Sequence, residues 1–214
     1  MSAKKYLPYL LAILSFVIVS LAYFYPVLEG KELFQSDIAQ FRGMASEVRE
    51  FREQNGEEPY WTNRAFGGMP TYQLSPYYPH DYIKKLDGLL RVLPRPADDL
   101  FLYFFWCFIL LRVLRTEWKT AVIGALGFGL STYLIIILGV GHNAKAHAIA
   151  YMPLVLAGIL WVFQGRYLQG FTLTAIAMAL EINASHPQMT YYLLFSVLIF
   201  GVVQMIEAWR KKGL

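Results

Sequence analysis

The sequence predicts an all-α integral membrane protein with about six transmembrane helices and a long extracytoplasmic first loop, and three observations lead to this prediction. The composition is 57% hydrophobic and only 16% charged, with a mean hydropathy of +0.40. Continuous apolar runs of about 20 residues recur, long enough to cross a hydrocarbon core of about 30 Å as helices. Membrane-spanning strands would instead alternate apolar and polar residues. Basic residues gather in alternate loops, as in multi-pass membrane proteins.

The apolar runs define six predicted spans: residues 7–28, 99–115, 120–141, 147–163, 168–185 and 189–208. They divide the chain into a first transmembrane helix (1–28), an extracytoplasmic loop with interfacial helices (29–98) and a five-helix transmembrane bundle (99–214).

Small residues in two spans predict packing rather than chemistry. Gly124, Gly127 and Gly129 lie in the third span, where glycine lets a neighbouring helix approach closely. The single cysteine, Cys107, lies in the second span and is interpreted as a small apolar packing residue. With one cysteine, an intrachain disulfide is excluded.

Positive charge orients the predicted spans. Basic residues precede the first span, follow the last and occupy two intervening loops: Lys4, Lys5, Arg112, Arg115, Lys119, Arg166, Arg210, Lys211 and Lys212. Because such residues favour the cytoplasmic side, both termini are predicted to be cytoplasmic. The polar face of the protein is then expected outside the cytoplasm. All histidines fall on that outer face: His80, His142, His147 and His186.

The long outer loop contains two amphipathic patterns. Within 34–54, apolar residues recur every three or four positions between charges, which predicts a helix along the membrane surface. Residues 83–93 repeat the pattern over a shorter length. Between them, 59–82 is rich in aromatic residues, glycine and proline and is predicted to be an ordered irregular loop. Its aromatic side chains suit an interfacial belt or a sugar site.

Asp37 stands just beyond the outer end of the first span, where two roles are open. A carboxylate at the start of a helix is stabilised by backbone N–H groups and the helix dipole. Alternatively, Asp37 is a general base that takes a proton from an incoming hydroxyl group.

The outer hairpin at 142–147 is predicted to bind an anion. Lys145 supplies a compact positive charge, and His142, Asn143 and His147 supply hydrogen-bond donors for phosphate oxygens. Snorkelling of Lys145 and loop-capping hydrogen bonds are the structural alternative. The two histidines are five residues apart, a poor spacing for two metal ligands on one helix, so no metal site is predicted.

The fifth span ends in a second polar turn, 181-EINASHPQ-188. Glu181 lies roughly 20 Å along this span at about 1.5 Å per residue, where a carboxylate requires a partner. Lys145 or His147 is the expected partner, in a substrate site or in a structural ion pair. His186 joins the same predicted substrate-binding group.

Four sequence blocks carry a family resemblance: 33-LFQSDIAQF-41, 59-PYWTNRAFGGMPTY-72, 139-GVGHNAKAHAIAYMPL-154 and 181-EINASHPQMTYY-192. Together they resemble the YfhO family of bacterial membrane proteins, which is similar in layout to the GT-C glycosyltransferases that use lipid-linked sugar donors. In GT-C enzymes, an acidic residue in the first outer loop acts as catalytic base or metal ligand, and Asp37 matches that position. The resemblance therefore implies a catalytic Asp37 and a location in the bacterial cytoplasmic membrane.

Two features depart from the family pattern. The chain ends after six predicted spans at 209-WRKKGL-214, whereas relatives are longer, so it is expected to be the N-terminal portion of a longer protein. The first loop lacks a paired Asp-x-Asp, so no divalent cofactor is predicted.

The resemblance implies transfer of a sugar from a polyprenyl-phosphate donor to an extracytoplasmic acceptor such as a cell-envelope glycan or glycolipid. The expected partners are then the lipid bilayer and the polyprenyl-phosphate-linked sugar, and no nucleic acid. A lipid or glycan transporter is one alternative, although no polar residues comparable to those of the outer face line the inner halves of the spans. A non-catalytic membrane subunit is the other. No oligomeric state is predicted.

Overall fold

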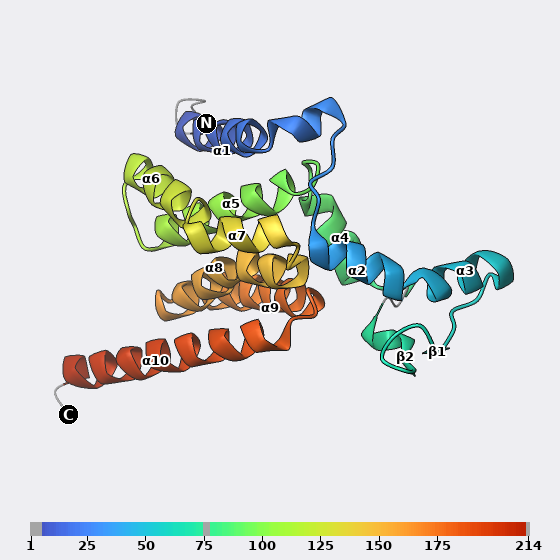
Figure 1. The fold of residues 1–214 in the computed structure, drawn as a ribbon. Helices are drawn as coiled ribbons and strands as arrows, with labels where there is room; N and C mark the ends of the chain where they lie inside the picture. Colours follow the sequence, from blue (N-terminus) through green and yellow to red (C-terminus); the bar gives the residue numbers. More distant parts are fainter. Residues whose placement is uncertain (1–5, 75–77, 213–214) are drawn as a thin grey trace.

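The computed structural model describes residues 6–74 and 78–212, and this part of the chain is built from helices (Figure 1). The α-helices are α1 (Leu7–Tyr23), α2 (Ser36–Met44), α3 (Ser46–Asn55), α4 (Tyr82–Leu90), α5 (Ala97–Val113), α6 (Trp118–Gly129), α7 (Thr132–Val140), α8 (Asn143–Phe163), α9 (Tyr167–Asn183) and α10 (Pro187–Lys212). Two 3-10 helices, η2 (Tyr25–Glu29) and η3 (Thr71–Gln73), and a two-stranded hairpin complete the described elements. The predicted all-α class is confirmed.

Among the described residues, two helices, α8 and α10, are long and apolar enough to cross a membrane. A third span is formed if α6 and α7, which are bent by 46° at a short break, are counted as one. α1 is a shorter apolar helix that continues into η2. Two or three such helices agree with the prediction of a helical membrane protein. The predicted count of six spans remains a prediction.

The break between α6 and α7 was not expected within 120–141. α6 ends at Gly129, after a segment rich in glycine, the residue that favours a helix least apart from proline. Ser131 then takes an extended conformation at φ −61° and ψ 141° and begins α7 as its N-cap residue. Serine is favoured at this position, so the sequence contains a local stop and a local restart.

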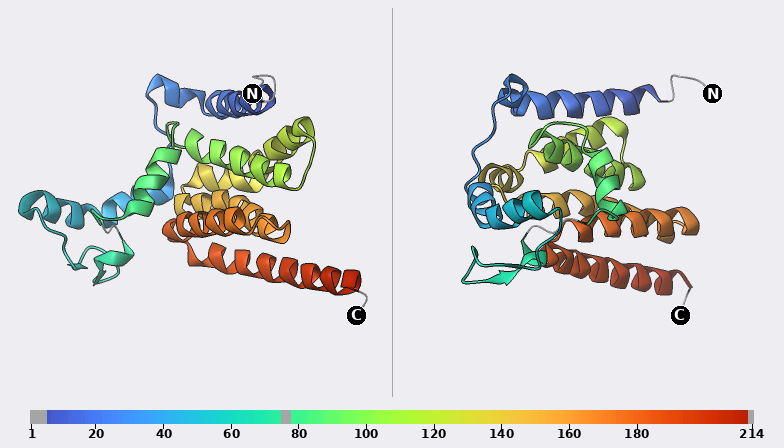
Figure 2. Two further views of the ribbon diagram at one scale, coloured as in Figure 1. Left: turned by 180° about the vertical axis from the view of Figure 1, so that it is seen from behind. Right: turned by 90° about the vertical axis from the view of Figure 1, so that its right-hand side faces the viewer.

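The helices stack in successive layers from α1, through α5 with α6 and α7, to α8 with α9, and finally α10 (Figures 1 and 2). The centre is filled by large aromatic side chains with no more than 1% exposure, including Phe16 of α1, Phe104 and Phe108 of α5, and Tyr151 of α8. Much of α10 is exposed, since only 11% of its apolar segment is buried. This helix therefore presents an apolar face to its surroundings.

Glycine permits the closest helix contacts. A Cβ at Gly124 would meet Leu111 at 2.8 Å, and one at Gly129 would meet Phe104 at 2.5 Å, so the predicted close approach is confirmed at these two positions. Gly127 has no such neighbour within 4 Å.

A tighter contact joins α8 to α9. A Cβ at Gly158 would lie 2.7 Å from the backbone nitrogen of Thr174, and one at Gly170 would lie 2.6 Å from that of Val162. Glycine in each helix thus lets the backbone of the other come close, at Thr174 of α9 and at Val162 of α8.

The predicted amphipathic helix at 34–54 is instead two helices, α2 and α3, separated at Ala45. The shorter predicted helix is α4. Between them, β1 (Trp61–Thr62) pairs antiparallel with β2 (Met69–Pro70), so the predicted irregular loop contains a small hairpin; residues 75–77 of that loop lie outside the described part. Figures 1 and 2 show α3 and this hairpin projecting beyond one end of the bundle.

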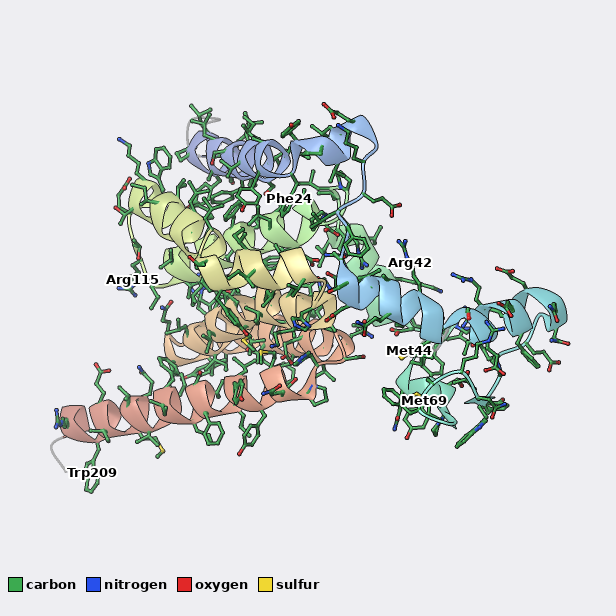
Figure 3. The ribbon with its side chains drawn as sticks, in the orientation of Figure 1. Phe24, Arg42, Met44, Met69, Arg115 and Trp209 are labelled. Atoms are coloured by element: carbon green, nitrogen blue, oxygen red, sulfur yellow. The ribbon has the colours of Figure 1, made fainter. Side chains whose placement is uncertain are left out.

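The two ends of the bundle differ. Figure 3 shows Arg115 and Trp209 at one end, whereas Arg42 and Met69 lie beyond the other. We call the second the loop end, because α2, α4, the α7–α8 turn and the α9–α10 turn meet there.

Candidate functional site

The α7–α8 turn and the start of α2 meet at the loop end, where the backbone of Gly141 lies against the Gln35 side chain. Gly141 adopts φ +95°, and a Cβ there would lie 2.8 Å from the Cβ of Gln35. Gln35 donates a hydrogen bond of 2.6 Å to the Leu138 carbonyl oxygen, and its amide pairs with that of Asn143 at 3.3 Å. These contacts hold the first turn of α2 against the start of α8. Asn143, predicted to bind substrate, is therefore partly engaged with Gln35.

Asp37 contacts the same turn. Its Oδ2 lies 2.8 Å from Nδ1 of His142, and the two side chains are 41% and 48% exposed. Exposed ion pairs contribute only about 0–1 kcal/mol to stability, so this pair does little for the fold. The predicted proximity of Asp37 to the 142–147 hairpin is present, while its catalytic role remains a prediction.

Lys145 and His186 lie next to His142 and add an ammonium group and a second imidazole. Burial lowers the pKa of His186, and the nearby charges of Lys145 and His142 lower it further. Nδ1 of His186 is buried without a hydrogen-bond partner in the described part of the chain. Within residues 6–74 and 78–212, no carboxylate oxygen lies within 4.0 Å of the Lys145 ammonium nitrogen. We call His142, Lys145 and His186 the basic group.

His147 lies apart from the basic group, on the other side of α8. Its Nε2 is 2.5 Å from Oδ1 of Asp87, and its Nδ1 is 2.9 Å from Oδ1 of Asp99. The side chain is buried, with 7% exposure. Because carboxylates engage both ring nitrogens, His147 has no N–H left to donate to a phosphate. The predicted phosphate-binding group therefore excludes His147.

Glu181 also differs from its predicted arrangement. The side chain is fully buried, and both carboxylate oxygens accept from the Thr190 hydroxyl at 3.1 and 3.0 Å. The expected ion pair with Lys145 or His147 was wrong. Threonine, one turn into α10, satisfies this carboxyl group with a neutral donor, so α9 and α10 are joined by a hydrogen bond.

A buried polar network joins α4 to the bundle, and we call it the α4 anchor. It consists of Asp87, Arg91, Asp98, Asp99, His147 and Tyr151. The Tyr151 hydroxyl donates to Asp87 Oδ1 at 2.6 Å, beside the contact from His147. Burial alone would raise the pKa of Asp87, but the hydrogen bonds from His147 and Tyr151 and the charges of His147 and Arg91 hold it below its ordinary value.

Arg91 completes this network at the end of α4. Its guanidinium lies 2.6 Å from Asp98 and 3.2 Å from Asp99, both in the first turn of α5 and at most 2% exposed. Three carboxylates thus face two basic groups, Arg91 and His147, in a buried environment. Buried charges persist only when they are paired and hydrogen-bonded in this way.

Sequence reasoning did not identify the α4 anchor as a site, although signals for it were present. Asp98 and Asp99 stand at the start of the second predicted span, where a carboxylate needs a partner. Asp87 and Arg91 are four residues apart in the predicted amphipathic helix, so they share one face. The missing information was that this face meets α5 and α8.

A cleft of about 860 Å³ lies between α2 and the starts of α5 and α8. Its lining includes Lys31, Gln35, Arg42, Arg95, Asp99 and Asn143. We call it the loop-end cleft. It is bordered both by the Gln35–Asn143 contact and by the α4 anchor, and three of its lining side chains are cationic. In the described residues, no three His, Cys, Asp or Glu side chains form a group that could hold a metal ion.

No protein-family model, curated protein or solved structure matches this chain.

Proposed function

We propose that this chain belongs to a bacterial membrane glycosyltransferase with the layout of the YfhO and GT-C proteins. It would transfer a sugar from a polyprenyl-phosphate donor to an extracytoplasmic acceptor. The observation that carries this proposal is the Asp37–His142 contact of 2.8 Å, with Lys145 and His186 beside it at one end of an apolar bundle. A carboxylate base and a phosphate-binding group are the two parts that such a transfer needs.

Asp37 is suited to accept the proton of the acceptor. Its carboxylate is 41% exposed, and His142 holds one oxygen. The acceptor oxygen forms a bond to the anomeric carbon while its proton passes to Asp37. The bond from the anomeric carbon to the phosphate oxygen breaks, and its electron pair stays on that oxygen. His142 orients the base through the observed contact.

The basic group is suited to the departing phosphate. Negative charge on the phosphate grows as the sugar leaves, since a phosphate monoester carries about −1.5 to −2 charges at neutral pH. Lys145 has no carboxylate partner within 4.0 Å in the described chain, so its charge is available. Positive charge placed where negative charge develops lowers the barrier to reaction.

The proposed membrane arrangement has six spans, with α1, α5 and α9 crossing beside α8, α10 and the bent pair of α6 and α7. The Arg115 end would be cytoplasmic, because short loops rich in arginine and lysine favour that side. The loop end, with Asp37 and the basic group, would then face outward. Lipid-linked sugars could reach it from the outer leaflet.

The test is turnover of a panel of polyprenyl-phosphate hexoses by purified protein in proteoliposomes, followed as release of polyprenyl phosphate. Asp37→Asn keeps the size of the side chain but removes the basic carboxylate. We expect turnover to fall by about 10²–10⁴-fold, the usual contribution of a general base, with donor binding unchanged. Lys145→Ala should weaken both turnover and donor binding, because its charge meets the phosphate before and during transfer.

Glu53→Gln is the matched control, because Glu53 is an exposed carboxylate on α3. It should leave turnover unchanged. Near-normal turnover by Asp37→Asn would refute the proposed base and leave Asp37 as a carboxylate in the first turn of α2, where the helix dipole favours negative charge.

A further inference from the structure

An apolar groove of about 580 Å³ runs along the side of the bundle between α8, α9 and α10. Its lining includes Ile159, Met178, Ile182, Thr190, Leu194 and Val197. We call it the α9–α10 groove. Ligand sites in proteins commonly have about 300–1,000 Å³, so the groove has the capacity to bind a ligand. Its walls consist almost entirely of apolar side-chain atoms.

The groove has a defined depth along α10. Its lining on this helix extends from Pro187 to Val197. Ten residues at about 1.5 Å each correspond to about 15 Å, half of a hydrocarbon core of about 30 Å. An extended chain that enters at the loop end would therefore reach the middle of the bilayer. α8 and α10, which border the groove, are both long and apolar enough to span it.

The mouth of the groove lies beside the basic group. Pro187 lines the groove and follows His186 directly in the sequence. His186 lies in the field of Lys145 and His142, which disfavours its protonated form. A long α-helix, α10, also begins at this point, and the start of a helix favours negative charge. An anion at the mouth would interact favourably with Lys145 and would favour the protonated form of His186.

We propose that the α9–α10 groove binds the isoprenoid chain of a polyprenyl phosphate, with the phosphate held by Lys145 and His186. This inference rests on the proposed function, because it identifies where the lipid of the donor is held. One groove accepts one chain, whereas a bulk phospholipid has two chains. A released polyprenyl phosphate carries nearly two charges and one chain, which matches the basic group and the groove.

The test measures binding of farnesyl phosphate to the purified protein in detergent by native mass spectrometry, with farnesol and phosphatidylglycerol as comparison ligands. Farnesyl phosphate should bind at least about tenfold more tightly than farnesol, and Lys145→Ala should remove this difference. Leu194→Trp places an indole in the groove and should weaken binding of farnesyl phosphate by about tenfold, equivalent to roughly two methylene groups left unburied. Ile182→Trp, from the α9 wall, should reproduce this loss independently.

Leu198→Trp is the matched control. Leu198 lies one turn after Leu194 on α10 with similar exposure, 54% against 51%, but does not line the groove. It should bind farnesyl phosphate like the unmodified protein. Unchanged binding by both groove variants would overturn the inference. Phosphatidylglycerol binding as tightly as farnesyl phosphate, and weakened equally by Leu194→Trp, would overturn it in favour of a phospholipid site.

The failure of this inference is distinguishable from failure of the proposed function. If Leu194→Trp loses farnesyl phosphate while Asp37→Asn keeps normal turnover, the lipid site stands and the proposed base fails. If Asp37→Asn abolishes turnover while both groove variants bind normally, the transferase stands and the groove assignment fails.

Discussion

The α4 anchor should decide whether α4 stays docked on the bundle, and Asp87→Ala tests this directly. Asp87 is 14% exposed and accepts hydrogen bonds from His147 at 2.5 Å and from Tyr151 at 2.6 Å. Hydrogen bonds to charged groups contribute about 1.5–3 kcal/mol each, and loss of one partner from a buried pair costs about 3–5 kcal/mol. We therefore expect the free energy of α4 undocking to fall by about 3–5 kcal/mol.

Hydrogen exchange of the α4 backbone amides in detergent micelles measures this change. A fall of about 3–5 kcal/mol corresponds to a loss of protection of roughly 10²–10⁴-fold, if α4 opens as a local unit. Lys84→Ala is the control on the same helix, since Lys84 is exposed, and should change stability by no more than about 0.5 kcal/mol. Protection in Asp87→Ala equal to that of the unmodified protein would show that the anchor does not hold α4.

Acid provides a second readout of the same contacts. The pKa of Asp87 is held below its ordinary value of 3.8. The stability that its ionised form supplies is therefore present above pH 3.8 and is lost as the pH falls below it, through the depressed pKa. Protection of α4 in the unmodified protein should decrease in that range. Asp87→Ala should lack this component of the pH dependence.

Two other predictions concern helix packing and orientation. Gly158→Ala should lower stability by about 1–3 kcal/mol, seen as a lower Tm in detergent, because the added Cβ would lie 2.7 Å from the Thr174 nitrogen. Gly127→Ala is the control, since a Cβ at Gly127 would have nothing within 4 Å. An equal Tm for both variants would contradict the packing argument. A cysteine at Ser185 should react with an impermeant thiol reagent in intact cells, and one at Thr116 should not; labelling at Thr116 alone would reverse the proposed orientation.

The helices could be predicted from composition and apolar runs because helix formation depends on local sequence. The runs at 147–163 and 189–208 correspond to α8 and α10, the two helices suited to cross a membrane. The break at Ser131 was missed because a helix-period reading averages over the local preferences of glycine and serine. The division at Ala45 was missed for the same reason, since the apolar spacing continues across it.

The alternating direction of the predicted spans indicated which residues come together at the loop end. Successive spans run in opposite directions, so residues at alternate turns come to one end of a bundle. This reasoning brought Asp37 near the 142–147 hairpin, where it contacts His142. It also placed His186 near the same turn, where His142 and Lys145 influence its charge.

The partner of each polar side chain depended on packing between helices. The five-residue spacing indicates that His142 and His147 point in different directions. It does not indicate which neighbouring helix each side chain contacts. The rotation and docking of α4 and α5 turned His147 toward Asp87 and Asp99. Glu181 likewise meets Thr190 because α10 returns along α9. Local sequence specifies the faces of a helix, whereas side-chain complementarity over the whole bundle selects the neighbour that covers each face.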